Sequence, residues 1–243
     1  TLGRDMVQNL RKAGVDTDAI RLEKGEPTGM AVVCVDQEGN NSIIVVPGAN
    51  RCCDIEYLKQ NQAYFEDCDI VLLQMEIPYE SVCYAVDVAS KLHKTVILNP
   101  APAPESLPDS IYEKLDYLTP NESEFKKLTG CPTEREEDLI AHCGQLLDKG
   151  TRNVIITLGG RGALLVNRNG HRLYPPPKVK TVDTTAAGDT FNAALARKLA
   201  AGCSAGEAIV FANYASALAV SKPGAQDSVP SYEEVLTFKG SVE

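Results

Sequence analysis

Val182-Asp183-Thr184-Thr185-Ala186-Ala187-Gly188-Asp189-Thr190-Phe191 is the stretch that decides the fold, and it leads into the alanine-rich segment 192–199. Asp and Thr favour helix starts, and apolar residues at every fourth position from Phe191 on give the helix one apolar stripe. Residues 186–188 are therefore expected in the first helical turn, where free backbone N–H groups attract anions. Asp189 beside them suits a general base next to a phosphate. A capped helix packed on a sheet is the alternative interpretation.

The order of apolar segments predicts the architecture around this helix. From Asp69 onward, short apolar segments alternate with helical ones, which predicts a mostly parallel central sheet covered on both faces, a three-layer α/β/α sandwich. Segments 29–35 and 42–46 flank the polar residues 36–41 and predict a β-hairpin. No linker rich in Pro, Gly or Ser divides residues 1–243, so we expect one domain.

Composition narrows the function classes. Lys+Arg 24 against Asp+Glu 33 gives a net charge of −9 without a basic run, which argues against nucleic-acid or membrane partners. The eight cysteines form no C-x-x-C pair and fit a reducing cytoplasm. No apolar run has the length of a membrane span, and the first residues have no signal-peptide core. The missing initiator Met indicates a truncated or processed chain.

Two common nucleotide-binding motifs are missing from the sequence. The chain contains no Gly-Lys dipeptide, which excludes a P-loop, and no G-x-G-x-x-G, which argues against a dinucleotide dehydrogenase.

The stretch D-T-T-x-A-G-D-T-F from Asp183 resembles the C-terminal signature of the ribokinase-like (PfkB) carbohydrate kinase family. The resemblance implies that Ala186, Ala187 and Gly188 form an anion hole for the transferred phosphate. It also implies that Asp189 is the catalytic base, in contact with the sugar. Ala186 stands where the family usually has Gly, so the N–H donors are kept while the turn loses the freedom of glycine.

The first half of the chain is similar to the sugar-binding side of the family. The resemblance implies that strands within about 28–50 form a small β lid inserted in the kinase domain, which covers the sugar and joins a homodimer. Pro47-Gly48-Ala49-Asn50 resembles the end of that lid, and an ordinary turn is the alternative. Glu76, which follows a buried strand, is expected to contact the sugar, although a helix-leading acid explains it equally well.

Three further motifs match the family's ATP site, each with a purely structural alternative. Asn121-Glu122-Ser123-Glu124 is a capping-box pattern that also matches the family's N-x-x-E motif, which places Mg²⁺ near Glu124 through water. Gly159-Gly160-Arg161-Gly162 reads equally as a hairpin turn, and Asn213 as a locally satisfied polar residue. The implied ATP-binding residues are Asn121, Thr157, Leu158, Gly159, Gly160, Arg161, Gly162, Gly188, Asp189 and Asn213.

Segment 222–230 resembles the closing loop that encloses a monovalent cation, usually K⁺, in ribokinases, and a surface turn is the alternative. The implied K⁺ residues are Asp183, Thr185, Ala219, Lys222, Gly224 and Ser228.

The resemblance covers nearly the whole chain and implies an ATP-dependent sugar kinase. Its expected reaction moves the γ-phosphate of ATP to a primary hydroxyl, with ribose favoured and 2-deoxyribose, fructose or a nucleoside left open. The family begins with a further βαβ-sized region that carries a sugar-binding Asp and a Gly-Gly loop, and nothing before Gly3 supplies it. A non-catalytic nucleotide-binding fragment is therefore the second hypothesis.

Overall fold

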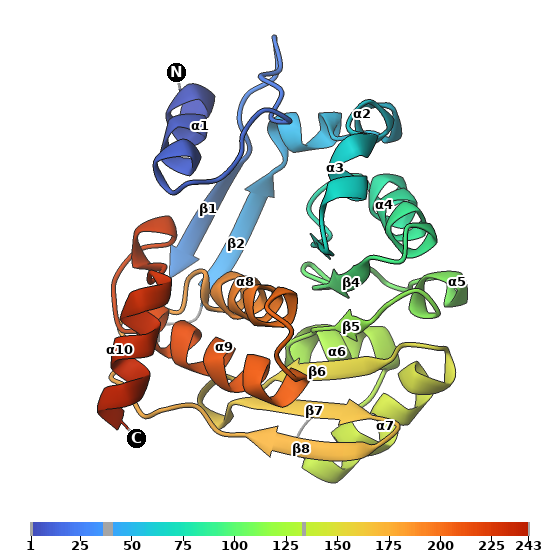
Figure 1. Cartoon of the computed structure of the whole chain (residues 1–243), viewed down its shortest axis with the longest axis vertical. Coiled ribbons are helices and arrows are strands. Elements are labelled where there is room, and N and C mark those ends of the chain that lie inside the picture. Colours follow the sequence, from blue (N-terminus) through green and yellow to red (C-terminus); the bar gives the residue numbers. More distant parts are fainter. Residues whose placement is uncertain (1, 36–40, 133–134, 243) are drawn as a thin grey trace. The chain divides into compact units, whose positions relative to one another are not determined.

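The computed structural model describes residues 2–35, 41–132 and 135–242. The chain divides into two compact units, whose helices and strands are labelled in Figure 1. The first consists of Thr1–Asp67 and Glu76–Ala85, and the second of Cys68–Met75 and Val86–Glu243. Within the described ranges, no helix has the length and apolar content needed to cross a membrane.

The first unit contains the predicted hairpin. Strands β1 (Met30–Val35) and β2 (Asn41–Val46) pair antiparallel with Val32 opposite Ile44, while predicted turn residues 36–40 lie outside the described residues. The unit's helices are α1 (Leu2–Lys12), η1 (Gly48–Cys52), α2 (Ile55–Gln60), α3 (Gln62–Asp67) and the first part of α4 (Tyr79–Lys91).

Pro47-Gly48-Ala49-Asn50 forms the start of η1 rather than an ordinary turn. Gly48 has a φ of 53°, and a Cβ there would lie 2.3 Å from the carbonyl oxygen of Pro27. The Ala49 amide donates to that same oxygen at 2.8 Å. The end of the hairpin is therefore tied to the segment before it through a contact that only glycine permits.

The second unit is built on a six-stranded sheet in the order β3-β4-β5-β6-β7-β8. Its strands are β3 (Ile70–Leu73), β4 (Thr95–Leu98), β5 (Tyr117–Leu118), β6 (Asn153–Thr157), β7 (Ala163–Asn167) and β8 (Gly170–Tyr174). Strands β3 to β6 pair in parallel, whereas β7 and β8 return antiparallel. The parallel part was predicted, and β8 was not.

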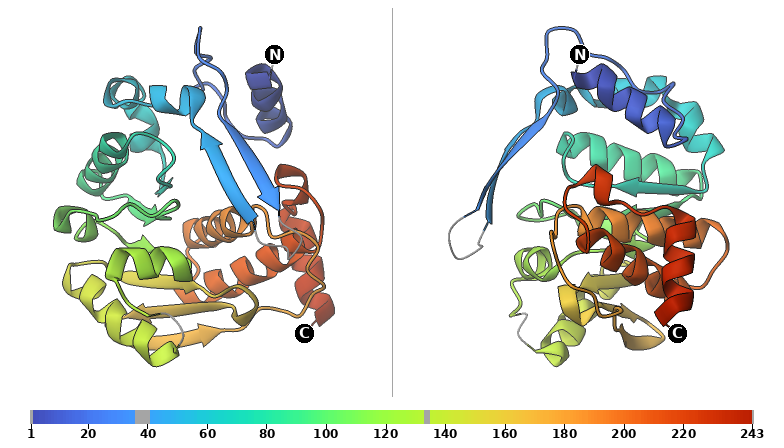
Figure 2. Two further views of the ribbon diagram at one scale, coloured as in Figure 1. Left: turned by 180° about the vertical axis from the view of Figure 1, so that it is seen from behind. Right: turned by 90° about the vertical axis from the view of Figure 1, so that its left-hand side faces the viewer.

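Helices cover both faces of this sheet, which confirms the predicted α/β fold (Figure 2). Helices α8 (Ala187–Ala200) and α9 (Ala205–Val220) lie side by side. Their residues Phe191, Leu195 and Ile209 form a hydrophobic core together with Ile155 of β6 and Leu165 of β7, and all five residues are below 9% exposed. Helix α7 contacts β6 and β7 through a stripe that includes Leu139 and Cys143. The helices of this unit are the rest of α4, α5 (Asp109–Tyr112), α6 (Glu122–Thr129), α7 (Glu136–Asp148), η2 (Gly159–Arg161), α8 (Ala187–Ala200), α9 (Ala205–Val220), η3 (Gln226–Ser228) and α10 (Tyr232–Val242).

Candidate active site

Helix α8 begins at Ala187, and Ala186 is its N-cap residue without a side-chain cap. Ala186 therefore lies just before the first turn, rather than in it as predicted. The reason is that Asp183 accepts from the Thr185 N–H and hydroxyl instead of capping the helix. The chain enters α8 through a left-handed residue, with φ 60° and ψ 12° at Ala186.

The start of α8 presents free amides. The N–H groups of Ala186, Gly188 and Asp189 have no acceptor among the described residues, while that of Ala187 donates to the Thr184 carbonyl at 3.3 Å. Gly188 is exposed, and a Cβ built on it meets nothing within 4 Å. Unpaired amides at the positive end of a helix dipole are suited to bind an anion.

Asp189 is the third residue of α8 and is exposed. An acid at this position commonly turns back to bond the N-cap amide, as Glu124 does in α6. The Asp189 carboxylate makes no hydrogen bond or ion pair within the described ranges. It is therefore available to accept a proton from a bound molecule.

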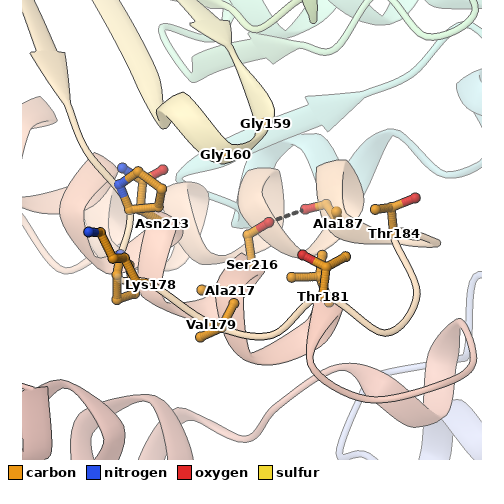
Figure 3. Close-up of a pocket in the computed structure, with 13 residues that line it drawn as sticks. Gly159, Gly160, Lys178, Val179, Thr181, Thr184, Ala187, Asn213, Ser216 and Ala217 are labelled. Atoms are coloured by element: carbon orange, nitrogen blue, oxygen red, sulfur yellow. Dashed lines mark hydrogen bonds between the residues drawn. The ribbon is translucent and has the colours of Figure 1, made fainter.

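Two adjoining cavities of about 520 and 420 Å³ lie beside this turn, within the size range of small-ligand sites. Figure 3 shows the larger of the two. They share Gly159, Ala187, Asn213 and Ser216. The larger is lined mostly by small and apolar groups, and the smaller also includes polar residues at the ends of β5 and β6. The further lining residues are Gly160, Pro176, Pro177, Lys178, Val179, Thr181, Thr184, Ala217 and Val220 in the larger cavity and Asn121, Glu122, Ser123, Thr157, Gly162, Gly188 and Phe191 in the smaller.

The cavities bring together most of the residues predicted for ATP. Those in the lining are Asn121, Thr157, Gly159, Gly160, Gly162, Gly188 and Asn213. Leu158 is instead buried beneath the turn, and Arg161 forms an ion pair with Glu122. Asp189 is outside the lining, one residue beyond Gly188. The ATP role of all these residues stays a prediction.

Some residues of segment 176–181, which follows β8, and one residue of α9 were not predicted from the sequence. Pro176, Pro177, Val179 and Thr181 line the larger cavity although they belong to no motif. The run of three prolines at 175–177 was the available signal, since proline gives a loop a fixed course. Ser216 was also missed, and its hydroxyl donates to the Ala187 carbonyl at 3.0 Å (Figure 3).

Asn121 and Glu124 form the predicted capping box at the start of α6. Asn121 Oδ1 accepts from the Glu124 amide at 2.9 Å, and Glu124 Oε2 accepts from the Asn121 amide at 2.8 Å. Burial raises the pKa of the Glu124 carboxyl, whereas the hydrogen bond from the Asn121 amide acts to lower it, and the effect of burial is the larger. Glu124 Oε1 has no partner among the described residues. A half-buried carboxylate with one oxygen to spare fits a nearby divalent cation, which would relieve its desolvation.

The glycine-rich turn is a tight link between β6 and β7. Gly159 and Gly162 have φ of 54° and 99°, and the Leu158 amide donates to the Gly162 carbonyl at 2.8 Å. A Cβ on Gly162 would lie 2.0 Å from the Tyr174 carbonyl oxygen, whereas one on Gly159 or Gly160 meets nothing within 4 Å. The hairpin interpretation is correct, and the same turn also exposes bare backbone to the cavities.

Asn213 is buried and lines both cavities. Its Nδ2 donates to the Tyr174 carbonyl at 2.8 Å, so the side chain is satisfied locally on one side, as the structural alternative predicted. Its Oδ1 has no partner within the described ranges, which leaves an acceptor for a ligand.

The segments predicted to enclose K⁺ partly meet at Asp183. Its carboxylate accepts from the Thr185 hydroxyl at 2.7 Å, the Thr185 amide at 2.9 Å and the Gly224 amide at 3.1 Å. These bonds, chiefly that of the Thr185 hydroxyl, hold the pKa of Asp183 below its usual value. Because the folded-state pKa is depressed, their contribution to stability is present above the unfolded pKa and is lost as pH falls through the folded one.

The remaining predicted K⁺ residues make bonds of their own. The Lys222 ammonium lies 3.1 Å from a Glu234 carboxylate oxygen, and the backbone amide of Lys222 donates to the Ala219 carbonyl. Buried Ser228 donates to the Ala225 carbonyl at 2.7 Å. Of the predicted K⁺ residues, Asp183 offers an anionic carboxylate, an oxygen ligand of the kind that a hard cation prefers.

The left-handed residue at the start of α8 gives a stability prediction. We expect Ala186→Gly to raise the free energy of unfolding by about 0.5 kcal/mol, because the strain relieved, ~1–2 kcal/mol, exceeds the ~0.5–1 kcal/mol entropic cost of glycine. Urea unfolding measures the change. Ala193→Gly, at an exposed helical position in α8, is the matched control and should lose about 1 kcal/mol. A similar loss at position 186 would contradict the prediction.

Glu76, the predicted sugar contact, is exposed and belongs to the first unit. Its role stays a prediction.

Comparison with known proteins matches residues 1–232 to the model of the pfkB family carbohydrate kinases. The ribokinase of Haemophilus influenzae is 37% identical over 238 residues, which cover 98% of this chain and 78% of that protein. The bifunctional ribokinase/ribose-5-phosphate isomerase A of Fructilactobacillus sanfranciscensis is 38% identical over 232 residues. That match covers 95% of this chain but 43% of the larger protein, less than half its length.

The solved structures give the same relationship. The structure of Arabidopsis thaliana ribokinase complexed with ribose and ATP is similar to this chain with a TM-score of 0.86 and 35% identity. The similarity covers 93% of this chain and 73% of that one. From the fold, the start of α8 and these matches together, the chain belongs to the pfkB family of carbohydrate kinases.

Proposed function

We propose that this protein is an ATP-dependent sugar kinase that transfers the γ-phosphate of ATP to a primary hydroxyl, with D-ribose as the preferred acceptor and ribose 5-phosphate as the product. The observation that carries this proposal is the start of α8. There, the free amide of Gly188 lines the smaller of two adjoining cavities, and the free amide and uncommitted carboxylate of Asp189 follow it directly in the chain. The matches to ribokinases, one of them solved with ribose and ATP, support the choice of substrates.

We assign the base of ATP to one cavity and its phosphates to the other. The larger, with Pro176, Pro177 and Val179, suits the flat apolar faces of the base. The smaller, with Asn121 and Gly188, suits the phosphates, because both residues present hydrogen-bond donors. The Asn213 acceptor, in the lining that the cavities share, would bind the ribose of ATP or the amino group of its base.

The chemistry assigned to this chain is positioning and charge stabilisation. The Gly188 and Asp189 amides bind the oxygens of the transferred phosphoryl group as charge builds on them. Asp189 takes the proton from the sugar's primary hydroxyl. Glu76 is assigned to contact the sugar, as the family resemblance implies.

Two cations complete the proposal. Glu124 is the residue that would hold Mg²⁺ through water, and Mg²⁺ neutralises phosphate charge when it is bound. Asp183 and Thr185, with backbone groups of Ala219, Lys222, Gly224 and Ser228, would hold K⁺ beside the anion hole. The hydrogen bonds that keep Asp183 ionised support this assignment.

We further propose a cytoplasmic homodimer formed through the hairpin of the first unit. Met30, Val32, Ile44 and Val46, paired across β1 and β2, are 40% to 60% exposed. An apolar strand face of this kind is suited to cover a sugar or to pair with a second copy.

A coupled ADP-release assay tests the proposed reaction. With ATP, Mg²⁺ and K⁺ present, we expect turnover with D-ribose to exceed that with 2-deoxyribose, fructose and inosine, and mass spectrometry to find ribose 5-phosphate. Omission of K⁺ should lower the rate. ATP binding without ADP release for any acceptor would support the non-catalytic alternative, and a preference for another acceptor would correct the substrate.

A further inference from the structure

Besides Ala186 at the N-cap, two peptide units within α8 offer free amides. One joins Ala187 to Gly188 and the other joins Gly188 to Asp189, and the N–H of each has no acceptor in the described part of the chain. A planar trans peptide points its C=O opposite its N–H. Whatever holds the carbonyl therefore also sets the direction of the amide.

Both carbonyls receive a side-chain hydrogen bond in addition to the helix. The Ala187 carbonyl accepts from Ser216 Oγ at 3.0 Å (Figure 3), and the Gly188 carbonyl accepts from Asn192 Nδ2 at 2.9 Å. Ser216 comes from α9 and Asn192 from α8 itself. The two bonds match the two free amides within the helix, one for each peptide unit, whereas the Ala186 amide is outside this pairing.

Asn192 is itself fixed by the sheet. It is 1% exposed, and its Oδ1 accepts from the hydroxyl of buried Thr119 at 2.7 Å. Thr119 directly follows β5, and its amide donates to the Leu98 carbonyl at the end of β4 at 3.0 Å. The carboxyl edge of the sheet is thereby connected to the Gly188 carbonyl through buried hydrogen bonds.

We propose that Ser216 and Asn192 are positioning residues for phosphoryl transfer, acting through the peptides 187–188 and 188–189. Each fixes the direction of one N–H. A hydrogen bond at the carbonyl also polarises its peptide and strengthens the opposite N–H as a donor. The inference rests on the proposed function, because the anion it serves is the transferred phosphoryl group.

Ser216 gives the sharper test, because it is only half-buried and its truncation leaves Asn192 and Thr119 in place. We expect Ser216→Ala to lower kcat about fivefold, the effect of one hydrogen bond, with KM for ATP within twofold of wild type. Ser216→Thr, which keeps the hydroxyl, should restore kcat. Ser241→Ala is the matched control, since Ser241 also donates to a backbone carbonyl, that of Phe238, at 2.7 Å on exposed α10.

The kinetic pattern separates positioning from the alternatives. Direct contact of Ser216 with ATP would raise KM instead of lowering kcat and would overturn the inference. A wild-type kcat for Ser216→Ala, or an equal loss in Ser241→Ala, would also overturn it. Asn192→Asp, which keeps the shape but replaces the donor, should lower kcat in the same way, with circular dichroism used to verify folding.

A second readout does not require kinase activity. Titration of the ¹⁵N-labelled protein with inorganic phosphate should shift the amide signals of Gly188 and Asp189, and Ser216→Ala should weaken the shift of Gly188 more than that of Asp189. If wild type bound phosphate in this way but released no ADP with any sugar, the proposed function would fail while the positioning role stood. Equal weakening at both amides, or none, would contradict the positioning role.

Discussion

Replacement of Asp189 by alanine is expected to lower kcat by about 10²–10⁴-fold while leaving ATP affinity within a fewfold of wild type. The loss has this size because a positioned general base typically contributes that factor. The carboxylate makes no bond within the described ranges, so its removal breaks no structural contact. ATP affinity is retained because Asp189 is outside the lining of both cavities. Steady-state kinetics with ribose and calorimetric titration of ATP measure the two quantities.

Two further variants make this prediction specific. Asp189→Asn keeps the shape and removes the base, so it should match the alanine variant in kcat. Glu233→Ala removes an exposed acid from the first turn of α10, a setting of the same kind outside the lining of both cavities, and should keep wild-type kcat. Activity of Asp189→Ala within a fewfold of wild type would show that another group takes the proton.

The second large effect is expected at Gly162. Its φ of 99° is strained for any other residue, and a Cβ would lie 2.0 Å from the Tyr174 carbonyl oxygen and 2.9 Å from Pro176. We expect Gly162→Ala to lower the free energy of unfolding by about 2–4 kcal/mol, from backbone strain and overpacking together. ATP affinity should fall as well, because Tyr174 holds Asn213 and Pro176 lines the larger cavity.

Gly160→Ala is the matched control in the same turn. Gly160 lacks a positive φ, and its Cβ would meet nothing within 4 Å. The free energy of unfolding of Gly160→Ala should therefore stay within about 0.5 kcal/mol of wild type, as is usual for substitutions at open surface positions. Urea unfolding and ATP titration of both variants test the pair. Equal losses of unfolding free energy in Gly160→Ala and Gly162→Ala would show that any side chain in this turn is destabilising, whether or not it meets the Tyr174 carbonyl.

The sequence was informative where local chemistry decides the structure. The hairpin segments 29–35 and 42–46 became β1 and β2 with bounds that differ by one residue at most, and the Asn121–Glu124 pattern became a complete capping box. Strand β8 was missed because its sequence Gly-His-Arg-Leu-Tyr lacks an apolar face, and most of it is exposed at the edge of the sheet. Pairing with β7, a contact that no local pattern encodes, is what makes it a strand.

The candidate site was predictable to the extent that motifs carry it. The small residues at 186–188 and Asp189 were found because their types alone indicate phosphate chemistry. The left-handed Ala186 was not foreseen, since alanine normally avoids this conformation and only the bonds of Asp183 with Thr185 and Gly224 reveal the turn. Ser216 and the proline-rich wall were missed because their roles depend on which elements the fold places together.

The wall shared by the two cavities has a consequence for inhibitor chemistry. A flat heteroaromatic fragment in the 520 Å³ cavity and an acidic fragment in the 420 Å³ cavity would be neighbours across Gly159, Ala187, Asn213 and Ser216. Once joined by a short linker, the second fragment binds at a high effective concentration instead of from free solution. Tethered compounds of this kind should gain far more affinity than either half suggests, which makes this wall the natural place to begin ligand design.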